Sequence, residues 1–336
     1  MNDWAEFRHF KYLLAIAEFK GFRAAAEHLN TAEPNLSVQA KQFQEMFGIR
    51  LFKRTPSGRI QLTETGIAFK AIARDLLKAR DEAIAALIAV ERREIESLRF
   101  DCASCISRDL FRTAQDVHRE LVPGCSIRPT HGGTTQLIEE LISGSIDAAI
   151  VTSSVEHERL HVEEVRRDRL LVCLPKDHVL ASKAVLQPED LRDVPVVLYH
   201  PQLNLKAHTQ TLSFLTEAGA QVDDFAQASH PTELQALVKD GYGIALIREG
   251  TALDPELTSR SVAGVEWTMG ISIAYDKHRH PKSIPVLARH LKLRVGNPYA
   301  KPNPPTDIGA TRVERVKQKR GPKSEGGVPE QMSLLG

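Results

Sequence analysis

The amino-acid sequence predicts a multidomain α/β protein that begins with a winged helix-turn-helix and continues through one long helix. Three observations support this prediction. Two short helices at a tight turn precede a basic hairpin within residues 22–63, and residues 67–93 contain neither proline nor glycine. Strand-like and helix-like runs then alternate over residues 96–295. A chain of 336 residues is long enough for two or three domains with separate cores.

Composition and charge exclude several classes of protein. Hydrophobic residues make up 42% of the chain and charged residues 26%, as in ordinary globular proteins. Asp3 and Glu6 precede the first apolar run, so we expect no signal peptide, and the longest apolar stretch, residues 83–90, is too short to span a membrane. Four cysteines are too few for a disulfide scaffold. We therefore expect a cytoplasmic protein without a membrane partner.

The first helix is expected at residues 7–19, where apolar side chains recur at helical spacing. A short alanine-rich helix over residues 23–29 follows. A third helix begins at Pro34, which suits a first helical position because proline has no N–H to donate. A helix-turn-helix presents its second helix to the DNA major groove in this way. The apolar stripe predicted for the third helix consists of Leu36, Ala40, Phe43 and Phe47.

Short polar side chains lie on the faces of these helices that point away from the stripe. A solvated helix face is the plainer interpretation of such residues, but the hairpin that follows favours contact with DNA. The helix residues that we expect to contact DNA are Arg23, Thr31, Glu33, Pro34, Asn35, Ser37, Val38 and Lys41.

Residues 49–63 are expected to form a β-hairpin, because two strand-like runs flank the turn sequence Pro56-Ser57-Gly58. The net charge of the chain is only +1, so any basic surface must be local, and basic residues surround this turn. The hairpin would form a wing whose contacts with phosphates add affinity but little sequence discrimination. Turn chemistry alone is the alternative explanation. The wing residues that we expect to contact DNA are Arg54, Thr55, Ser57 and Arg59.

Residues 67–95 are expected to form a linker helix that dimerises. Apolar residues recur every three, four or seven positions along it, and charges occupy other positions. A solitary amphipathic helix of this length needs a partner, and a second copy of itself is the economical one. Two-fold symmetry would also set the spacing of two DNA-binding heads. The stripe consists of Ile72, Leu76, Ala83, Leu87 and Val90.

Residues 96–295 follow the pattern of a doubly wound sheet, in which ligands bind at the carboxyl ends of strands. Strands are expected at residues 98–100, 126–130, 147–151, 170–174, 194–199, 225–228, 244–247 and 267–275. Helices are expected at residues 109–121, 134–142, 231–240 and 284–293. Residues 296–336 are rich in glycine, proline and basic residues, and we expect a disordered tail that either adds non-specific DNA affinity or only solubilises the terminus.

Short motifs connect the chain to a known family. The N-terminal ones are Phe10-x-x-Leu13, Ala24-Ala25-Ala26-Glu27-x-Leu29, Pro34-x-Leu36-Ser37-x-Gln39, Gly48-x-x-Leu51-Phe52-x-Arg54 and Leu62-Thr63-x-x-Gly66. The later ones are Gly144-x-x-Asp147-Ala148-Ala149-Ile150 and Val238-x-x-Gly241-x-Gly243-Ile244-Ala245. With these motifs the chain resembles the LysR-type transcriptional regulators over roughly residues 7–295.

The resemblance implies a winged helix-turn-helix DNA-binding domain at residues 1–66, a dimerising linker helix at 67–95 and a periplasmic-binding-protein-like α/β effector domain at 96–295. It implies that the effector domain has two lobes, lobe I at about residues 96–169 and 270–295 and lobe II at about 170–269. It also implies a small inducer bound between the lobes, and often a tetramer.

Three positions depart from the family pattern. The recognition helix opens Ala32-Glu33-Pro34 where relatives usually have Ser/Thr-Gln-Pro, and Glu33 can accept a hydrogen bond from cytosine but cannot donate one to guanine. Asn35 replaces a usual alanine or serine and could make two hydrogen bonds to adenine. Arg248 stands where proline is common. The operator sequence of relatives is therefore not expected to transfer.

Polar residues at strand ends and at one helix start are candidates to bind the effector. Thr134 and Thr135 follow two glycines, and the simplest interpretation is that they cap the next helix, whose N-terminus would also favour a carboxylate or other anion. The resemblance implies that Thr134 faces the inducer. The complete set of expected effector-binding residues is Cys102, Ser104, Thr134, Thr135, Thr152, Ser229 and His230.

The spacing Cys102-x-x-Cys105 is open to three interpretations: a redox pair, half of a zinc site, or packing around a thiol-lined pocket. No second Cys pair is present, which disfavours zinc, and no basic residue separates the two cysteines, which disfavours redox chemistry. Gly241-x-Gly243 lacks the third glycine of a dinucleotide-binding loop. We therefore expect no cofactor, no metal site and no catalytic residue.

The expected function is sequence-specific transcriptional regulation of the LysR type, controlled by a small anionic effector, without enzyme activity. The expected partners are double-stranded DNA with a pseudo-palindromic operator, the effector, and further copies of the chain in a dimer or tetramer; RNA polymerase could be another. Two alternatives stay open. One is a redox-responsive regulator acting through Cys102 and Cys105, and the other is a DNA-binding protein whose C-terminal domain serves only oligomerisation.

Overall fold

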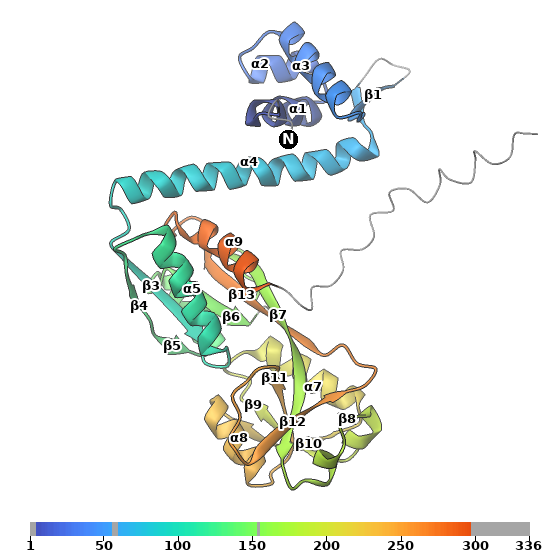
Figure 1. The fold of residues 1–336 in the computed structure, drawn as a ribbon, viewed down its shortest axis with the longest axis vertical. Coiled ribbons are helices and arrows are strands. Elements are labelled where there is room, and N and C mark those ends of the chain that lie inside the picture. Colours follow the sequence, from blue (N-terminus) through green and yellow to red (C-terminus); the bar gives the residue numbers. More distant parts are fainter. Residues whose placement is uncertain (1–4, 56–59, 153–154, 297–336) are drawn as a thin grey trace, which may run out of the picture. The chain divides into compact units, whose positions relative to one another are not determined.

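The computed structural model describes residues 5–55, 60–152 and 155–296 (Figure 1). Its N-terminal part contains α1 (Phe7–Phe19), α2 (Phe22–His28), α3 (Glu33–Met46), β1 (Phe52–Arg54), β2 (Ile60–Leu62) and α4 (Glu64–Glu91). The predicted helix-turn-helix, wing hairpin and long helix are therefore confirmed. Within the described part of the chain, no helix is long and apolar enough to cross a membrane.

An aromatic cluster joins the helix-turn-helix to the start of α4. The Phe10 ring stacks on the Phe69 ring with centroids 5.7 Å apart, and the Phe43 ring meets Phe69 edge-on at 5.9 Å. Phe69 and Ala73 of α4 lie in one buried cluster with residues of α1, α2 and α3. Because aromatic rings bury large areas, this cluster makes the first turns of α4 part of the N-terminal core.

The buried stripe of α3 ends earlier than the sequence predicts. Leu36, Ala40 and Phe43 are buried, but Phe47 is 36% exposed. The prediction for Phe47 is wrong because α3 ends at Met46, so the helical spacing no longer applies there.

Gly66 explains the Leu62-Thr63-x-x-Gly66 motif. The Thr63 side chain caps α4 by accepting a hydrogen bond from the Gly66 N–H at 3.0 Å, and its own hydroxyl donates to the Arg50 carbonyl at 2.5 Å. A Cβ on Gly66 would lie 2.1 Å from the Leu51 carbonyl oxygen, which is too close for any side chain. Glycine therefore allows α4 to begin directly against the strand that leads into the wing.

The remaining described chain alternates between strands and helices, which confirms the predicted α/β class. Its strands are β3 (Ser97–Ala103), β4 (Ser126–Arg128), β5 (His131–Gly132), β6 (Ala148–Thr152), β7 (Leu160–Pro175), β8 (Val185–Leu186), β9 (Pro195–Tyr199), β10 (Gln221–Ala228), β11 (Ala245–Arg248), β12 (Leu257–Val262) and β13 (Thr268–Asp276). Its helices are α5 (Arg108–Leu121), α6 (Thr134–Ser143), α7 (Leu205–Glu217), α8 (Pro231–Lys239) and α9 (Ile284–Val295), with 3-10 turns at Val179–Ser182 and Pro188–Leu191.

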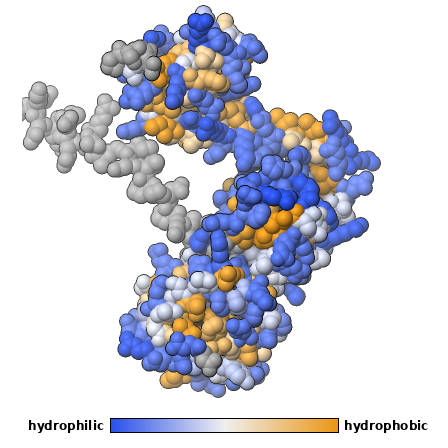
Figure 2. All heavy atoms as spheres, turned by 180° about the vertical axis from the view of Figure 1, so that it is seen from behind, coloured by the Kyte–Doolittle hydropathy of each residue, from blue (hydrophilic) through white to orange (hydrophobic). Residues whose placement is uncertain are grey.

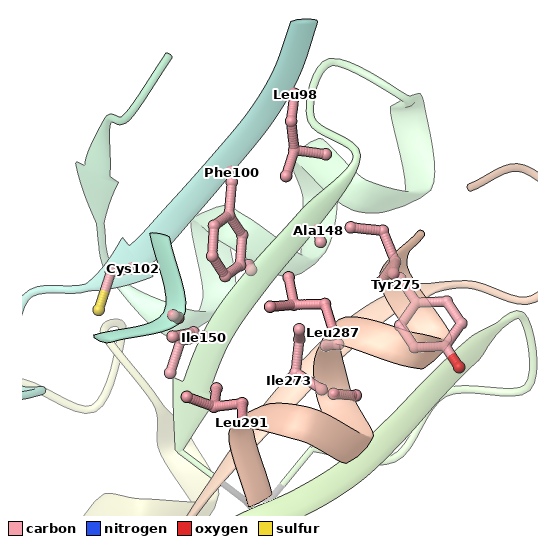
Figure 3. Close-up of a cluster of buried hydrophobic side chains, with 14 of the residues drawn as sticks. Leu98, Phe100, Cys102, Ala148, Ile150, Ile273, Tyr275, Leu287 and Leu291 are labelled. Atoms are coloured by element: carbon pink, nitrogen blue, oxygen red, sulfur yellow. The ribbon is translucent and has the colours of Figure 1, made fainter. Parts of the chain in front are cut away.

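Three sets of buried side chains lie in this region and divide it into two lobes. We call the elements around the first core lobe I; this core takes residues from β3, α5, α6, β6, α9 and one half of β7. Lobe II surrounds two further cores, which together include the other half of β7 with β9, α7, α8 and β11. Figure 3 shows apolar side chains from β3, β6, β13 and α9 converging in lobe I, with Cys102 at the margin of the cluster.

Strands β7 and β13 connect the two lobes. β13 pairs antiparallel with β7 from Thr268–Arg169 to Asp276–Leu160, with a register shift between Ile271 and Ser272. The other half of β7 pairs with β11 and β12 in lobe II. One strand thus supplies the sheets of both lobes, as Figure 1 shows.

His118 of α5 is fully buried beside α9. Its Nε2 lies 3.2 Å from the Ser283 hydroxyl, at the start of α9, and its Nδ1 has no hydrogen-bond partner in the structure. Burial, together with the nearby Arg119 charge, lowers the pKa of the His118 imidazole to about 4. The helices therefore pack around a neutral imidazole.

We predict that acid weakens the fold through His118. The unfolded chain binds this proton near pH 6.5 and the folded chain only near pH 4, so stability is unaffected above pH 6.5 and falls as the pH drops between these values, by up to about 3 kcal/mol. Calorimetric unfolding across this range should show a smaller loss for His118→Gln than for the wild type. His290→Gln, at an exposed position on α9, is the control. Equal pH profiles for wild type and His118→Gln would contradict the prediction.

Candidate functional site

The predicted DNA-contacting residues of α3 lie on one exposed face of that helix. Asn35, Ser37, Val38 and Lys41 are all exposed, and the opposite face of α3 is buried through Leu36. An exposed valine among polar residues suits contact with a thymine methyl group. Glu33, Pro34 and the α2 residue Arg23 are exposed too, while Thr31 is half-buried and its hydroxyl accepts a hydrogen bond from the Asn35 Nδ2 at 3.3 Å.

Two of these cations pair with carboxylates on their own helix. Arg23 lies 3.1 Å from Glu27, and Lys41 lies 3.7 Å from Glu45. Both pairs are exposed, and such pairs contribute at most a few tenths of a kcal/mol, roughly 0.3–0.5. Phosphate can therefore compete for either cation at little cost.

The wing is held against α3 by Gln44. The Gln44 Oε1 accepts a hydrogen bond from the Leu51 N–H at 2.8 Å, and its Nε2 donates to the Ala40 carbonyl at 3.0 Å. In the hairpin Arg54 pairs with Ile60, and Lys53, which the sequence analysis did not select, is exposed on the same strand. Thr55 is half-buried. The predicted contacts Ser57 and Arg59 lie outside the described residues.

The second group of candidates gathers where parallel strands end. In lobe I, β3 runs parallel to β5 and β6, so Ser104, Thr152 and the start of α6 follow their carboxyl ends. Ser104 is exposed, whereas Thr152 is buried and its hydroxyl lies 3.7 Å from the Cys105 sulfur. Carboxyl ends of parallel strands are the usual position of ligands in α/β folds.

The start of α6 differs from the prediction. The N-cap is Gly133, and no side chain caps the helix, so the interpretation of Thr134 as a capping residue is wrong. The Thr134 side chain is only 4% exposed and its hydroxyl has no hydrogen-bond partner in the structure. A buried hydroxyl without a partner costs free energy, about 1–3 kcal/mol, so the Thr134 hydroxyl would gain from a hydrogen bond to a ligand.

A loop of lobe II closes over this helix start. The Thr135 N–H and hydroxyl both donate to the Leu203 carbonyl, at 3.0 and 3.2 Å. Asn204 follows; its Oδ1 caps α7 by accepting from the Ala207 N–H at 3.1 Å, while its buried Nδ2 has no partner in the structure. We call this contact between Thr135 and Leu203, with Thr134 and Asn204 beside it, the interlobe junction.

Ser229 and His230 serve the start of α8. The His230 Nδ1 accepts a hydrogen bond from the Glu233 N–H at 3.1 Å, and the Ser229 N–H donates to the Glu233 carboxylate at 2.7 Å. The His230 side chain therefore caps α8, whereas Ser229 contributes only its backbone N–H. Both residues are exposed at the carboxyl end of β10.

Cys102 is buried in the lobe I core, with 2% of its surface exposed, and forms no disulfide. Burial raises the pKa of the Cys102 thiol well above its usual range, and the neighbouring Cys105 and Asp101 raise it further. A thiol of this kind is mostly protonated at neutral pH and reacts slowly with oxidants. Within the described residues, no group of three or more His, Cys, Asp or Glu side chains could hold a metal ion.

Two residues of lobe II at strand ends were not predicted from the sequence as effector-binding residues. Tyr199 ends β9 and Arg248 ends β11, which run side by side in parallel through the Val196–Ile244 bridge. Arg248 is buried. The strand-end rule that selected Ser229 could have selected both of them, since all three follow parallel strands of the same lobe.

Two open hollows on the surface are not lined by the predicted effector residues. One, of about 590 Å³, has Arg169, Lys183 and Arg260 on its wall, and the other, of about 560 Å³, lies along residues 155–162. The Arg260 guanidinium already donates to three backbone carbonyls, those of Lys183 at 2.7 Å, Ala181 at 2.6 Å and Ser259 at 2.7 Å. The Arg260 side chain therefore connects a turn to β12, and we assign it a structural role.

Comparisons with protein families match almost the whole described chain. Residues 7–67 match the bacterial regulatory helix-turn-helix protein, lysR family, and residues 91–294 match the LysR substrate binding domain. The transcriptional regulator AlsR of Bacillus subtilis (strain 168) is 27% identical over 82% of this chain and 91% of its own length. The dual regulator OxyR of Escherichia coli (strain K12) is 26% identical over 74% of this chain and 80% of its own.

Solved structures share the fold. Full-length BenM is 24% identical and covers 87% of this chain and 96% of its own, with a TM-score of 0.52. Full-length CbnR complexed with its target DNA is 20% identical, covers 87% of this chain and all of its own, and also has a TM-score of 0.52.

We predict different effects for two substitutions at the DNA-binding surface. Arg54→Ala should weaken binding to all sequences alike and reduce the slope of log K against log salt by about 1, because one phosphate contact is lost. Asn35→Ala should cost roughly 1–3 kcal/mol on a selected target sequence and little on unrelated DNA, because a base contact is lost. Fluorescence anisotropy at several salt concentrations measures both.

Lys176→Ala, at an exposed position of lobe II, is the control for removal of a positive charge and should bind DNA like the wild type. An Asn35→Ala protein that keeps full discrimination between selected and unrelated DNA would contradict the assignment of Asn35 to base contact.

Proposed function

The chain belongs to the LysR family of transcriptional regulators, and from this premise we propose that a small anionic effector bound between its lobes controls its action on DNA. It is a DNA-binding transcriptional regulator with an effector-binding domain, and members of this family are not enzymes. The observation that carries the proposal is the start of α6, where Thr134 buries a hydroxyl without a partner.

The chemistry of this helix start favours a carboxylate. The first N–H groups of a helix have no partner within the helix and carry a partial positive charge, so they attract an anion. At α6 the Leu203 carbonyl oxygen occupies the Thr135 N–H. A carbonyl oxygen carries only a partial negative charge, so a carboxylate would make the stronger hydrogen bond and displace it.

Displacing Leu203 would couple the effector to the shape of the domain. Leu203 and Asn204 lead directly into α7 of lobe II, while Thr134 and Thr135 begin α6 of lobe I. An effector at α6 therefore binds better when the lobe II loop has moved away, and this difference in affinity shifts the equilibrium between the two arrangements. The unpartnered Asn204 Nδ2 would donate to the same ligand.

We infer that α4 forms the dimer contact. Along α4, Ile72 is 62% exposed and Leu87 is 69% exposed, and Ile84 and Ile88 are also exposed. Figure 2 colours the surface by hydropathy, with hydrophobic residues in orange and hydrophilic residues in blue. An exposed apolar face of this kind on one helix is typical of a protein contact, and a second α4 offers a matching face. Two DNA-binding heads would then meet a pseudo-palindromic operator.

The further assignments follow from the same proposal. We propose a DNA-binding domain at residues 1–66, a linker helix at 67–95 and an effector domain at 96–295, assembled as a dimer or tetramer in the cytoplasm. Contact with RNA polymerase would link DNA binding to transcription. A redox-responsive regulator is the less favoured alternative, because burial raises the pKa of the Cys102 thiol.

Thr134→Val tests the effector site. Valine keeps the volume and removes the hydroxyl, so the ligand-free protein should melt at an equal or higher temperature, because an unpartnered buried group is gone. Binding of carboxylates should weaken by roughly tenfold, which corresponds to about 1.4 kcal/mol. Thermal-shift titration with sodium acetate, benzoate and succinate, and with their neutral amides, measures the difference.

Thr113→Val is the matched control, since the Thr113 hydroxyl donates to the Asp109 carbonyl at 2.8 Å on α5 and is not among the residues that define the junction. Carboxylate binding that is unaffected by Thr134→Val would contradict the proposed site. Stabilisation by amides as strong as by carboxylates would contradict an anionic effector.

Leu87→Glu tests the dimer contact. Because Leu87 is exposed in one chain, a charge there should leave the fold of that chain intact but should be unfavourable in a helix pair. Light scattering after size exclusion should show smaller species, and DNA affinity should fall by about a hundredfold as bivalent binding is lost. Val179→Glu, which changes an exposed apolar residue of lobe II, should do neither. An unchanged mass for Leu87→Glu would exclude this face of α4.

A further inference from the structure

Arg248 is a buried cation at the point where the lobes connect, in the position where the family motif commonly has proline. Arg248 is only 8% exposed. Burying a guanidinium is expensive unless hydrogen bonds and an opposite charge compensate it. Its partners therefore indicate what it does.

The guanidinium contacts both strands that connect the lobes. The Arg248 Nη1 donates to the Met269 carbonyl at 2.8 Å, and Nη2 donates to the Gly270 carbonyl at 3.3 Å, both on β13. Nη1 also lies 3.6 Å from the Asp168 carboxylate on β7. Asp168 pairs with Met269 in the ladder of β7 and β13. The Arg248 side chain, on β11 of lobe II, therefore contacts both strands where they cross between the lobes.

The Arg248 charge is only partly matched. Asp168, which is 5% exposed, lies closer to another cation, with Arg166 Nε 2.5 Å from its Oδ1. The neighbouring Glu164 is used by Arg167, whose Nε lies 3.0 Å from its Oε1. Two arginines thus share the Asp168 carboxylate. A guanidinium has five N–H groups, and Arg248 makes three contacts, with the Met269 and Gly270 carbonyls and the Asp168 carboxylate.

The positive charge of Arg248 acts on side chains of both lobes. Burial raises the pKa of the Tyr199 hydroxyl at the end of β9 and of the Cys102 thiol at the end of β3, and in both cases the Arg248 charge acts in the opposite direction. Tyr199 belongs to lobe II and Cys102 to lobe I. An anion between these strand ends would lie within the field of the same cation.

We propose that Arg248 is the specificity-determining residue of lobe II, which binds the acidic group of the effector and leaves Asp168 as it does so. This inference rests on the proposed anionic effector and adds the residue that selects for its charge. A bidentate contact with a carboxylate is stronger than the long, shared contact with Asp168. Moving the guanidinium also weakens its bonds to the Met269 and Gly270 carbonyls, so binding loosens the crossing of β7 and β13.

The first test changes the charge and shape of residue 248. Arg248→Gln should weaken binding of the stabilising carboxylate from the sodium acetate, benzoate and succinate series by at least about tenfold, and Arg248→Lys should keep part of the affinity because it keeps the charge. Arg260→Gln is the matched control: it also removes a guanidinium bonded to backbone carbonyls in lobe II, and should bind like the wild type.

The second test works in the opposite direction and does not depend on the folding of Arg248→Gln. Asp168→Asn removes the competing carboxylate, so Arg248 should bind the same carboxylate severalfold more tightly than in the wild type, by about threefold to tenfold. If Arg248 only supported the fold, the loss of its ion partner would leave affinity unchanged or lower it. Either of these results overturns the proposal.

Amide hydrogen exchange provides the readout of the strand crossing. Adding the carboxylate should speed exchange in β13 around Met269 and Gly270 in the wild type but not in Arg248→Lys. Carboxylate binding that Thr134→Val abolishes and Arg248→Gln leaves intact would keep the proposed function and overturn this inference. A wild-type protein that no carboxylate of the series stabilises contradicts the anionic effector and, with it, the role of Arg248.

Discussion

The effector domain depends on the continuity of β7. This strand of 16 residues pairs with β13 along one half and with β11 and β12 along the other, so a single run of backbone holds both lobes. Separating the lobes would break ladder hydrogen bonds, each worth roughly 0.5–1.5 kcal/mol net. Motion is cheaper where the ladder is already irregular, at the register shift between Ile271 and Ser272. The lobes can therefore rotate relative to each other about the crossing of β7 and β13, but they cannot separate.

The same crossing determines what the interlobe junction can bind. Because β3 and β6 of lobe I and β9 and β11 of lobe II run in parallel pairs, their carboxyl ends present polar groups and helix starts toward a ligand. In the structure, parts of the chain already fill this role: the Leu203 carbonyl occupies the Thr135 N–H, and Asp168 partly neutralises Arg248. Under the proposed function, a free carboxylate would make stronger contacts than either substitute. An effector would therefore gain affinity by replacing contacts between the lobes, and that exchange connects binding to movement.

The sequence predicted the elements that have a repeating apolar pattern, but it did not predict the features that depend on tertiary contacts. Apolar periodicity located α1, α3 and α4, and the turn at Pro56-Ser57-Gly58 located the wing strands. The first half of β7 escaped prediction because residues 161–169 are mostly charged, although pairing with β13 on one side makes them a strand. The effector candidates were chosen by their position after strands, which is local information. The pairing of Thr135 with Leu203 joins residues 68 positions apart, so local sequence could not predict it. The burial of Arg248 against β13 likewise depends on tertiary contacts.

Helix α4 belongs at its two ends to the cores of the helix-turn-helix and of lobe I. Phe69 and Ala73 near its start belong to the core of the helix-turn-helix, and Ala89 near its end belongs to the core of lobe I. Gly66 and the Thr63 cap connect its first turn to the wing without a flexible loop. A helix of 28 residues without proline bends little, so its two ends are not independent. With a second α4 packed along its exposed face, a turn of lobe I against lobe II would change the angle between two DNA-binding heads. Half-site spacing and DNA bending, and not base contacts, would then be the properties that an effector alters.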